Sequence, residues 1–183
     1  MEMKLHLGSG KRFLEGYTHV DLSTHSHIDY NQSIDNLENF KDDSIQEIYA
    51  SHVFEYFDLD HAKIVLAEWR RVLTTSGILR LAVPNLDSLL EVYSKTGNIE
   101  NILGPIFGKW EITSGNYSYH KIVYNEKLLT DLLDDAGFRN IKKWDWREIF
   151  KDNTDYDDHA QAYFPHMDKA NGIHISLNIE AQK

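Results

Sequence analysis

Near its start the chain reads Lys4-Leu5-His6-Leu7-Gly8-Ser9-Gly10, a short apolar run that breaks into a Gly-x-Gly sequence. Glycine has no Cβ atom, so the backbone at such a break can pass very close to a ligand. A second apolar run ends soon after at Val20-Asp21-Leu22. An acidic residue in that place can accept hydrogen bonds from the two hydroxyl groups of a ribose. Together the two features predict a cofactor that contains a nucleoside, held at the carboxyl edge of a parallel sheet.

The length and composition predict one folded domain that spans residues 1–183. A chain of 183 residues is long enough for one well-buried domain and short for two. Its hydrophobic content of 42% predicts a packed core rather than disorder. The sequence contains no cysteine, which excludes a disulfide framework, a thiolate metal site and a thiol nucleophile.

The charge and the apolar pattern indicate the cellular location of the protein and the classes of partner that it does not bind. Its formal net charge is −10, which disfavours nucleic acid and anionic membrane surfaces, because both attract basic proteins. No apolar run approaches the roughly 20 residues that span a bilayer, and the first residues do not read as a signal peptide. We therefore expect a cytoplasmic protein without a nucleic-acid or membrane partner.

Apolar patterns along the chain alternate between strand and helix. We expect strands at residues 3–7, 17–22, 45–50, 78–83, 138–148 and 173–181. We expect three helices: one from Asp58 or Asp60 to Gly77, one that begins at Asn85, and one between Asn125 and Gly137. In the second of these, the apolar face is Leu86, Leu89, Leu90 and Tyr93. Such alternation predicts an α/β protein, a Rossmann-like three-layer sandwich with a mostly parallel sheet.

Three segments depart from this pattern. Only residues 11–16 separate Gly10 from the second strand, so the first crossover is too short for an ordinary helix. Residues 97–124 are rich in glycine, asparagine and aromatic side chains, and we expect an irregular lid or substrate loop there. Residues 151–172 form a polar excursion before the last strand.

The order and spacing of several short pieces resemble one known family. These pieces are residues 5–11, 18–22, 48–57, 68–73, 77–85 and 128–138. Their collinear arrangement resembles the class I S-adenosylmethionine-dependent methyltransferases, and within them a compact subgroup of predicted methyltransferases. The resemblance implies a seven-stranded sheet whose last strand, residues 173–181, runs antiparallel beside residues 138–146. It also implies S-adenosylmethionine as the cofactor.

The resemblance implies roles for single residues. Gly8 and Gly10 would let the backbone approach the methionine portion of the cofactor, Asp21 would bind the ribose, and Leu22 would pack on the adenine. The acidic residue that often meets the adenine amino group has no clear match; Ser33 and Ile34 stand at that place, with Asp29 and Asp35 nearby. The complete set of expected cofactor-binding residues is Leu7, Gly8, Ser9, Gly10, Asp21, Leu22, Ser33, Ile34, Ser51 and His52.

Two histidines are the candidate catalytic residues. Ser51 and His52 would border the sulfonium and the methyl acceptor, and an imidazole titrates near neutral pH, so His52 is the first candidate base. Glu55 follows three residues later and could orient it. His120, in the aromatic segment before residue 124, is the second candidate. If the acceptor is already a good nucleophile, neither needs to be catalytic, and both could be ordinary packed residues.

Three functions remain open at this stage. The first is methyl transfer to a small-molecule or glycan-like acceptor, in a site that is open, completed by residues 97–124, or covered by the second subunit of a homodimer. The second is a non-catalytic, degenerate methyltransferase fold that binds cofactor or another protein. The third is a dinucleotide enzyme, which Phe13 disfavours because it occupies the place of the third glycine. No metal is expected, because neither His25 and His27 nor His159 with its acidic neighbours has a four-ligand spacing.

Overall fold

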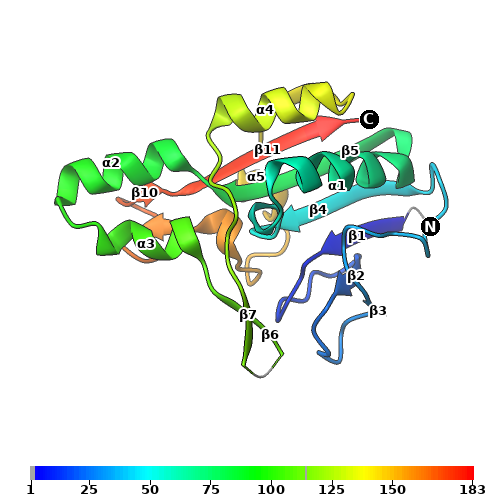
Figure 1. Ribbon diagram of the computed structural model, residues 1–183, viewed down its shortest axis with the longest axis horizontal. Helices are drawn as coiled ribbons and strands as arrows, with labels where there is room; N and C mark the ends of the chain where they lie inside the picture. Colours follow the sequence, from blue (N-terminus) through cyan, green and yellow to red (C-terminus); the bar gives the residue numbers. More distant parts are fainter. Residues whose placement is uncertain (1–2, 114) are drawn as a thin grey trace.

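The computed structural model describes residues 3–113 and 115–183, which build a seven-stranded sheet at their centre (Figure 1). The strand order is β3-β2-β1-β4-β5-β11-β8. β11 runs antiparallel to both β5 and β8, whereas the pairs from β3 to β5 are parallel. This topology confirms the predicted Rossmann-like sheet and its antiparallel last strand. The strands are β1 (Met3–Leu7), β2 (Thr18–Asp21), β3 (Tyr30–Asn31), β4 (Ile45–Ser51), β5 (Leu73–Pro84), β8 (Arg139–Lys143) and β11 (Ser176–Gln182).

Two short antiparallel pairs stand outside the central sheet. β6 (Trp110–Thr113) pairs with β7 (Asn116–Ser118), and β9 (Tyr163–Phe164) pairs with β10 (Ile173–His174). The hairpin of β6 and β7 projects away from the helices in Figure 1. The helices are α1 (Leu59–Val72), α2 (Leu86–Thr96), α3 (Glu100–Phe107), α4 (Glu126–Asp135) and α5 (Trp146–Ile149), with 3-10 turns η1 (Phe54–Tyr56) and η2 (His159–Gln161).

Side-chain caps start the three predicted helices where the sequence places them. The carboxylate of Asp58 accepts a hydrogen bond from the backbone N–H of His61 at the start of α1. The side chains of Asn85 and Asn125 do the same for α2 and α4. Each cap satisfies an N–H group that the first helical turn would leave without a partner.

The two faces of the sheet carry separate cores, because alternate residues of each strand point to opposite sides. Ile48 and Ala50 of β4 pack with buried residues of α1 and α4 on one face. Tyr49 points to the other face, where it packs with Trp144, Phe150, Tyr156 and Ala160 of the segment around α5 and η2. The second outer layer is therefore built mainly from this late segment, since residues 8–17 form turns without a helix. That finding confirms the shortened first crossover.

The predicted end of the first helix is wrong. α1 ends at Val72, and Leu73 already has extended backbone angles and pairs with Ile45. Gly77 lies inside β5, where the register against β4 is irregular. A Cβ atom there would be 3.0 Å from the carbonyl oxygen of Ile45. Gly77 therefore allows the close approach of the two strands at this β-bulge and does not end the helix.

The other differences concern the ends of elements and the exposed faces of helices. In α2, Leu89 and Val92 are buried, whereas Leu90 and Tyr93 are exposed, so the predicted apolar face is only partly right. Residues 97–124 are not irregular, because they contain α3 and the hairpin of β6 and β7. The strand predicted at 138–148 stops at Lys143 before α5, and residues 173–181 are divided between β10 and β11.

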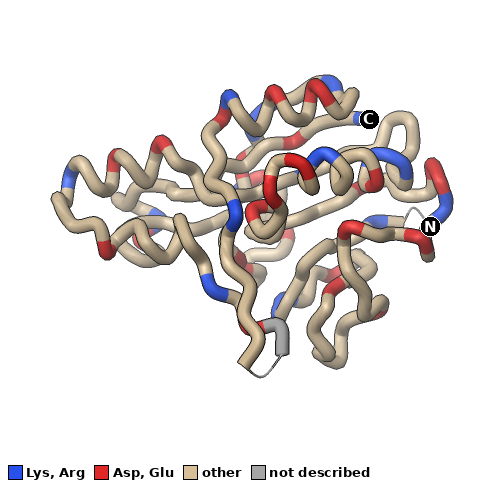
Figure 2. Tube along the Cα trace, in the orientation of Figure 1, with Lys and Arg blue, Asp and Glu red and all other residues tan. Residues whose placement is uncertain are grey.

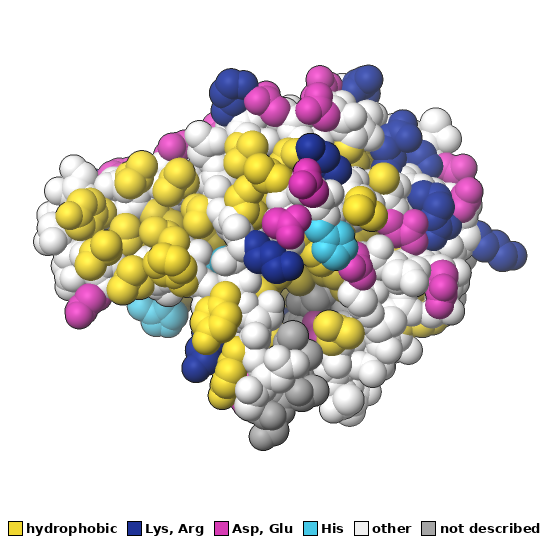
Figure 3. Space-filling model, viewed as in Figure 1, with side chains coloured by type: hydrophobic (Ala, Val, Ile, Leu, Met, Phe, Trp, Pro, Cys, Tyr) yellow, Lys and Arg dark blue, Asp and Glu magenta, His cyan; other side chains and the backbone are white. Residues whose placement is uncertain are grey.

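The outer surface mixes both charges and exposes an apolar area over α2 and α3. Basic and acidic residues are interspersed along α1, whereas α4 carries one lysine among several acidic residues (Figure 2). Apolar side chains gather over α2 and α3 (Figure 3), where the exposed members are Leu90, Tyr93, Ile99, Leu103 and Phe107. Among the helices in the described ranges, none combines the length and the apolar character that crossing a membrane requires.

Candidate functional site

A cavity of about 750 Å³ lies at the carboxyl edge of β1, β2 and β4. Every predicted site residue except one lines it, including the glycine loop, Asp21, His52 and His120. The exception is Leu7, whose side chain is fully buried in the main core. Residues that are far apart in the sequence thus converge at the edge where ligands bind in open α/β sheets.

The two glycines of the loop have conformations that favour glycine. Gly8 has a φ angle of +66° and Gly10 has a φ angle of +54°. A Cβ atom at Gly8 would lie 2.5 Å from Cγ2 of Val53, and one at Gly10 would lie 3.1 Å from the ring of Trp110. The loop is therefore pressed between Val53, two residues after the end of β4, and the hairpin.

Asp21 ties the end of β2 to this loop. Its Oδ2 atom accepts a hydrogen bond from the backbone N–H of Gly10 at 2.8 Å, and its Oδ1 atom accepts one from Ser23 at 2.6 Å. Each oxygen of an ionised carboxylate has two lone pairs, so both can accept a further hydrogen bond. Asp21 thus has a structural role and retains capacity for a ligand.

The residues expected near an adenine lie along one side of the cavity. Leu22, Ser33 and Ile34 line it, and the Leu22 side chain is about half exposed although it is apolar. The two acidic residues near them, Asp29 and Asp35, do not line the cavity, and each is bound to a protein group. Asp35 lies 2.8 Å from Nε2 of His61, and Asp29 accepts a hydrogen bond from the backbone of His19.

His52 is held in place by a chain of hydrogen bonds from β11. The Nδ2 atom of Asn178 donates to the carbonyl of Ala160, so its Oδ1 atom accepts the hydroxyl proton of Ser176 at 2.8 Å. Ser176 must then accept from Nε2–H of His52, 3.0 Å away. This leaves the lone pair of His52 on Nδ1, which lies 3.6 Å from Oε1 of Glu55.

His120 approaches the same carboxyl group from the other side. Its Nδ1 atom donates to the carbonyl of Pro105 at 2.9 Å, and its Nε2 atom lies 3.6 Å from Oε1 of Glu55. A Cβ atom at Gly108 would overlap the His120 ring, so this glycine leaves room for it. Both ring nitrogens of His52 and of His120 therefore face protein groups.

Burial sets the protonation of this three-residue group. Glu55 is fully buried, and desolvation raises the pKa of its carboxyl group to about 8. Burial lowers the pKa of His52 and of His120. At neutral pH the carboxyl group of Glu55 is mainly protonated and both imidazoles are neutral. The sequence suggested the contact between Glu55 and His52, but not the one with His120.

The cavity also contains residues that sequence reasoning did not place in the site. Arg12, Trp110 and His159 line it, and the His159 ring lies 5.3 Å from the His52 ring between centroids. The position of Arg12, two residues after Gly10, is a signal that the sequence offered. Trp110 and His159 are brought in by the hairpin and by η2, which have no strong sequence pattern.

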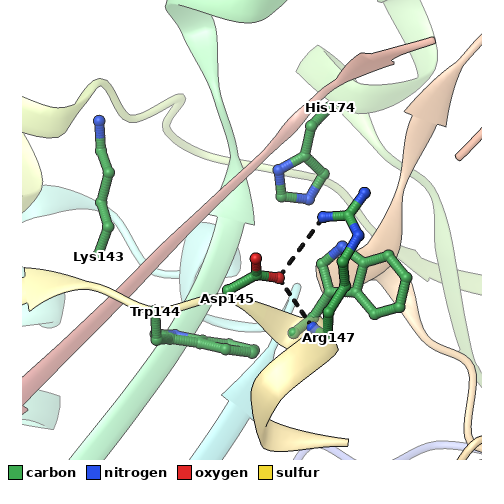
Figure 4. A pocket seen from close by; sticks show the side chains of 6 residues that line it. Lys143, Trp144, Asp145, Arg147 and His174 are labelled. Atoms are coloured by element: carbon green, nitrogen blue, oxygen red, sulfur yellow. Dashed lines mark hydrogen bonds and ion pairs between the residues drawn. The ribbon is translucent and has the colours of Figure 1, made fainter. Parts of the chain in front are cut away.

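A second pocket of about 320 Å³ lies at the end of β8 and is a weaker candidate (Figure 4). Its charged groups are already paired: Asp145 lies 3.5 Å from Arg147 and caps the backbone of α5. Arg147 also stacks on the Trp146 ring. Within residues 3–113 and 115–183, no three His, Asp or Glu side chains are grouped to hold a metal ion.

Comparison with known proteins supports the fold. No family model matches the chain, and no curated protein matches its sequence. Solved structures do match. One is a methyltransferase from Thermotoga maritima described as S-adenosylmethionine-dependent and as a possible histamine N-methyltransferase, with a TM-score of 0.60, 16% identity, and coverage of 100% of this chain and 83% of that one.

Two further structures agree with the first. An S-adenosylmethionine-dependent methyltransferase from Archaeoglobus fulgidus has a TM-score of 0.58 at 18% identity, and the match covers 100% of this chain and 86% of that one. The 1,6-didemethyltoxoflavin-N1-methyltransferase of Burkholderia thailandensis, solved with bound 1,6-didemethyltoxoflavin and S-adenosylhomocysteine, has a TM-score of 0.57 at 14% identity, and the match covers 99% of this chain and 70% of that one. The chain therefore has the fold of the class I S-adenosylmethionine-dependent methyltransferases. At these identities the likeness concerns the fold alone.

Proposed function

We propose that the protein binds S-adenosylmethionine and transfers its methyl group to a small-molecule or glycan-like acceptor. The observation that carries the proposal is the convergence of the glycine loop, Asp21 and His52 on one cavity at the carboxyl edge of the sheet. The similar solved structures include a complex with S-adenosylhomocysteine, which supports the choice of cofactor. A cytoplasmic location and a homodimer belong to the same proposal.

The residues present fit a nucleoside cofactor of this kind. The cavity volume of about 750 Å³ lies within the range of small-molecule sites. Gly8, Ser9 and Gly10 line the cavity where the methionine portion would pass, and the missing Cβ atoms of the two glycines leave room for Val53 and Trp110 against the loop. The half-exposed Leu22 offers an apolar surface for the adenine, and the Ser9 hydroxyl, buried without a hydrogen-bond partner among the described residues, borders the same cavity.

The residues of the chain would then divide the work of binding and positioning. When bound, the cofactor supplies a methyl carbon that is already activated by positive sulfur. Asp21 accepts hydrogen bonds from the ribose, Leu22, Ser33 and Ile34 contact the base, and Ser51 borders the reacting end. α3 and the hairpin of β6 and β7 act as the lid, because Gly104, Gly108 and Trp110 line the cavity. Such positioning is the main contribution that a protein makes to this displacement.

His52 and His120 remain our candidate bases, and the geometry adds Glu55 as the group that links them. Either imidazole can take a proton from a hydroxyl acceptor only if one ring nitrogen leaves its present partner, which is Ser176 or Glu55 for His52. With an acceptor that is already nucleophilic, the two rings need only hold it in line.

A non-catalytic role is the second candidate. The shortened first crossover favours it, because no helix follows the glycine loop to support the methionine portion. The lack of an acidic side chain facing the cavity near Ser33 and Ile34 points the same way, since Asp29 and Asp35 do not line it and are bound to His19 and His61. Such a protein would bind the cofactor or a protein partner without turnover.

Calorimetric titration tests the first step of the proposal. We expect S-adenosylmethionine and S-adenosylhomocysteine to bind the wild-type protein, and NAD not to bind. Asp21→Ala should weaken both ligands, whereas Asp29→Ala, which removes a nearby acidic side chain outside the cavity, should not. Absence of binding to the wild-type protein would refute the proposal. Binding without methyl transfer to a broad panel of hydroxyl and amine acceptors would favour the non-catalytic alternative.

A further inference from the structure

The permanently charged side chain of Arg12 has no carboxylate partner among the residues that the structure describes. Arg12 lines the cavity and is only partly exposed. Its Nε atom donates to the backbone carbonyl of Asp157 at 2.6 Å. Within the described ranges, no carboxylate oxygen lies within 4 Å of its nitrogens, and neither terminal nitrogen has a hydrogen-bond acceptor. The Asp157 carboxylate pairs with Lys169 instead.

The single bond to Asp157 fixes the direction of the guanidinium group. It joins the loop after β1 to the segment before η2. The backbone N–H of Arg12 also donates to the carbonyl of Ser9, which holds the residue against the glycine loop. With Nε engaged, the two terminal amino groups form the planar fork that binds carboxylates with two parallel hydrogen bonds.

The acidic side chains of the cavity do not serve as its partner. Asp21 and Asp158 line the cavity. Asp158 already accepts hydrogen bonds from Tyr49, Tyr156 and the backbone of Ala160. Asp21 accepts from two backbone N–H groups. A charged group that is partly removed from water and lacks a counterion is costly, and an anionic ligand group offsets that cost.

The other basic residues of the cavity are less suited to the task. The amino group of Lys109 lies over the Tyr117 ring at 4.0 Å, and that of Lys121 lies 4.0 Å from Asp58. Lys11 lines the cavity and is exposed to solvent. Arg12 also lies near His159. Desolvation by burial is the main reason for the lowered pKa of His159, and the positive charge of Arg12 is the next reason.

We propose that Arg12 is the anion-binding residue of the cavity and that it binds a carboxylate group of a ligand. The inference rests on the proposed function and deepens it. Two sources of the carboxylate are chemically equivalent at this residue: the methionine portion of the cofactor, and an acceptor that carries an acidic group. The position next to the glycine loop favours the first source, and the position near His159 favours the second.

A comparison of two cofactor-like ligands separates these sources. S-adenosylhomocysteine has a carboxylate, and 5′-methylthioadenosine lacks the whole amino-acid portion. If Arg12 binds the cofactor, Arg12→Met should weaken S-adenosylhomocysteine about tenfold or more and leave 5′-methylthioadenosine unchanged. Arg139→Met is the matched control, because it removes an exposed positive charge outside the cavity.

A simple aromatic carboxylate tests the other source. Benzoate is titrated into the protein loaded with S-adenosylhomocysteine. If the acceptor supplies the carboxylate, Arg12→Met should leave S-adenosylhomocysteine binding unchanged and abolish benzoate binding. If Arg12→Met lowers the yield of folded protein, the same titrations are made with Arg12→Gln, which keeps hydrogen-bond donors but has no charge.

Two results would overturn the proposal. One is that neither variant changes the affinity of S-adenosylhomocysteine or of benzoate. The other is that both nucleoside ligands weaken equally, which would mean that Arg12 shapes the site rather than binds an anion. Failure of the proposed function is recognised separately, since both nucleosides would then fail to bind the wild-type protein. In that case, loss of benzoate binding to the unloaded protein on Arg12→Met still supports the anion site, and no change overturns it.

Discussion

The carboxylate of Asp21, at the end of β2, accepts a hydrogen bond of 2.8 Å from the backbone N–H of Gly10. This bond joins the two features that define the candidate site, since Gly10 belongs to the loop after β1. The acidic residue therefore shapes the glycine loop before any ligand is present. An effect of Asp21 on ligand binding must be separated from its effect on the loop.

Replacement of Asp21 should lower both stability and ligand affinity. Asp21→Ala leaves the N–H groups of Gly10 and Ser23 without their acceptor, and we expect the free energy of unfolding to fall by about 1–3 kcal/mol. Asp21→Asn keeps one acceptor oxygen and should lose less. Urea unfolding and calorimetric titration with S-adenosylhomocysteine measure the two effects.

Asp29 is the control for this prediction. Its carboxylate also accepts a backbone hydrogen bond at 2.8 Å, from His19, but it does not line the cavity. Asp29→Ala should lower stability without a change in affinity for S-adenosylhomocysteine. An unchanged stability of Asp21→Ala would contradict the structural role that we assign to the bond with Gly10.

Gly8 should tolerate a side chain less well than Gly16 does. Both have positive φ angles, +66° and +83°, which cost a non-glycine residue about 1–2 kcal/mol. A Cβ atom at Gly16 meets nothing within 4 Å, whereas one at Gly8 would lie 2.5 Å from Val53. Gly8→Ala should therefore cost about 1–3 kcal/mol more than Gly16→Ala in chemical denaturation.

Truncation of Val53 separates the two reasons for glycine at position 8, which are the contact with Val53 and the positive φ angle. Val53→Ala removes the atoms that the new Cβ would meet but leaves the backbone angle unchanged. The double variant Gly8→Ala, Val53→Ala should recover part of the loss, so the two effects should not add. Simple additivity of the two single losses would show that contact with Val53 is not the reason for the glycine.

The sequence predicted those parts of the molecule that short-range patterns determine. The caps of α1, α2 and α4 depend on single polar side chains at the helix starts, and all three are found where expected. The alternation of strands and helices predicted the sheet. The end of α1 was misplaced because Leu73 suits both the apolar face of a helix and the buried start of β5.

Other features arise from contacts between distant residues or from elements with few buried side chains. α3 is short, includes Pro105 and buries only Ile102, so no helical period is visible in residues 97–124. Glu55 and His120 lie 3.6 Å apart only because the chain returns along η1, where Lys121 donates to the carbonyl of Glu55. No local pattern in the sequence marks that return.

Trp110 should report ligand binding through its fluorescence. It is the tryptophan that lines the cavity, and it lies over Gly10. Trp69 and Trp144 are buried and donate to backbone carbonyls, so their surroundings should change little. Titration with S-adenosylhomocysteine should alter the emission of the wild-type protein, and Trp110→Phe should remove most of that change.

Trp146 provides the control for the fluorescence measurement. It lines the second pocket at the end of β8 rather than the main cavity. Trp146→Phe should therefore retain the signal that Trp110→Phe loses. A signal that survives in Trp110→Phe, with ligand affinity intact, would show that the hairpin does not contact the bound ligand.

Glu55 should make the protein less stable as the pH rises from neutral. Its pKa is about 8 in the folded protein and near 4.5 in the unfolded chain, so the folded state holds the proton more tightly. The stabilisation from this group is complete below pH 4.5 and is lost as the pH rises to 8. The loss approaches about 1.4 kcal/mol per pH unit between these values.

The window from pH 7 to pH 8 isolates this effect. The buried histidines His6, His52 and His120 have lowered pKa values, so their stabilisation is lost only as the pH falls below 6.5. Between pH 7 and 8, urea unfolding of the wild-type protein should show the falling stability, and Glu55→Gln, which carries no titrating proton, should not. Glu91→Gln, at an exposed ion pair with Lys95, should behave like the wild-type protein. Equal pH dependence of Glu55→Gln and the wild-type protein would mean that Glu55 is not held protonated between the two imidazoles.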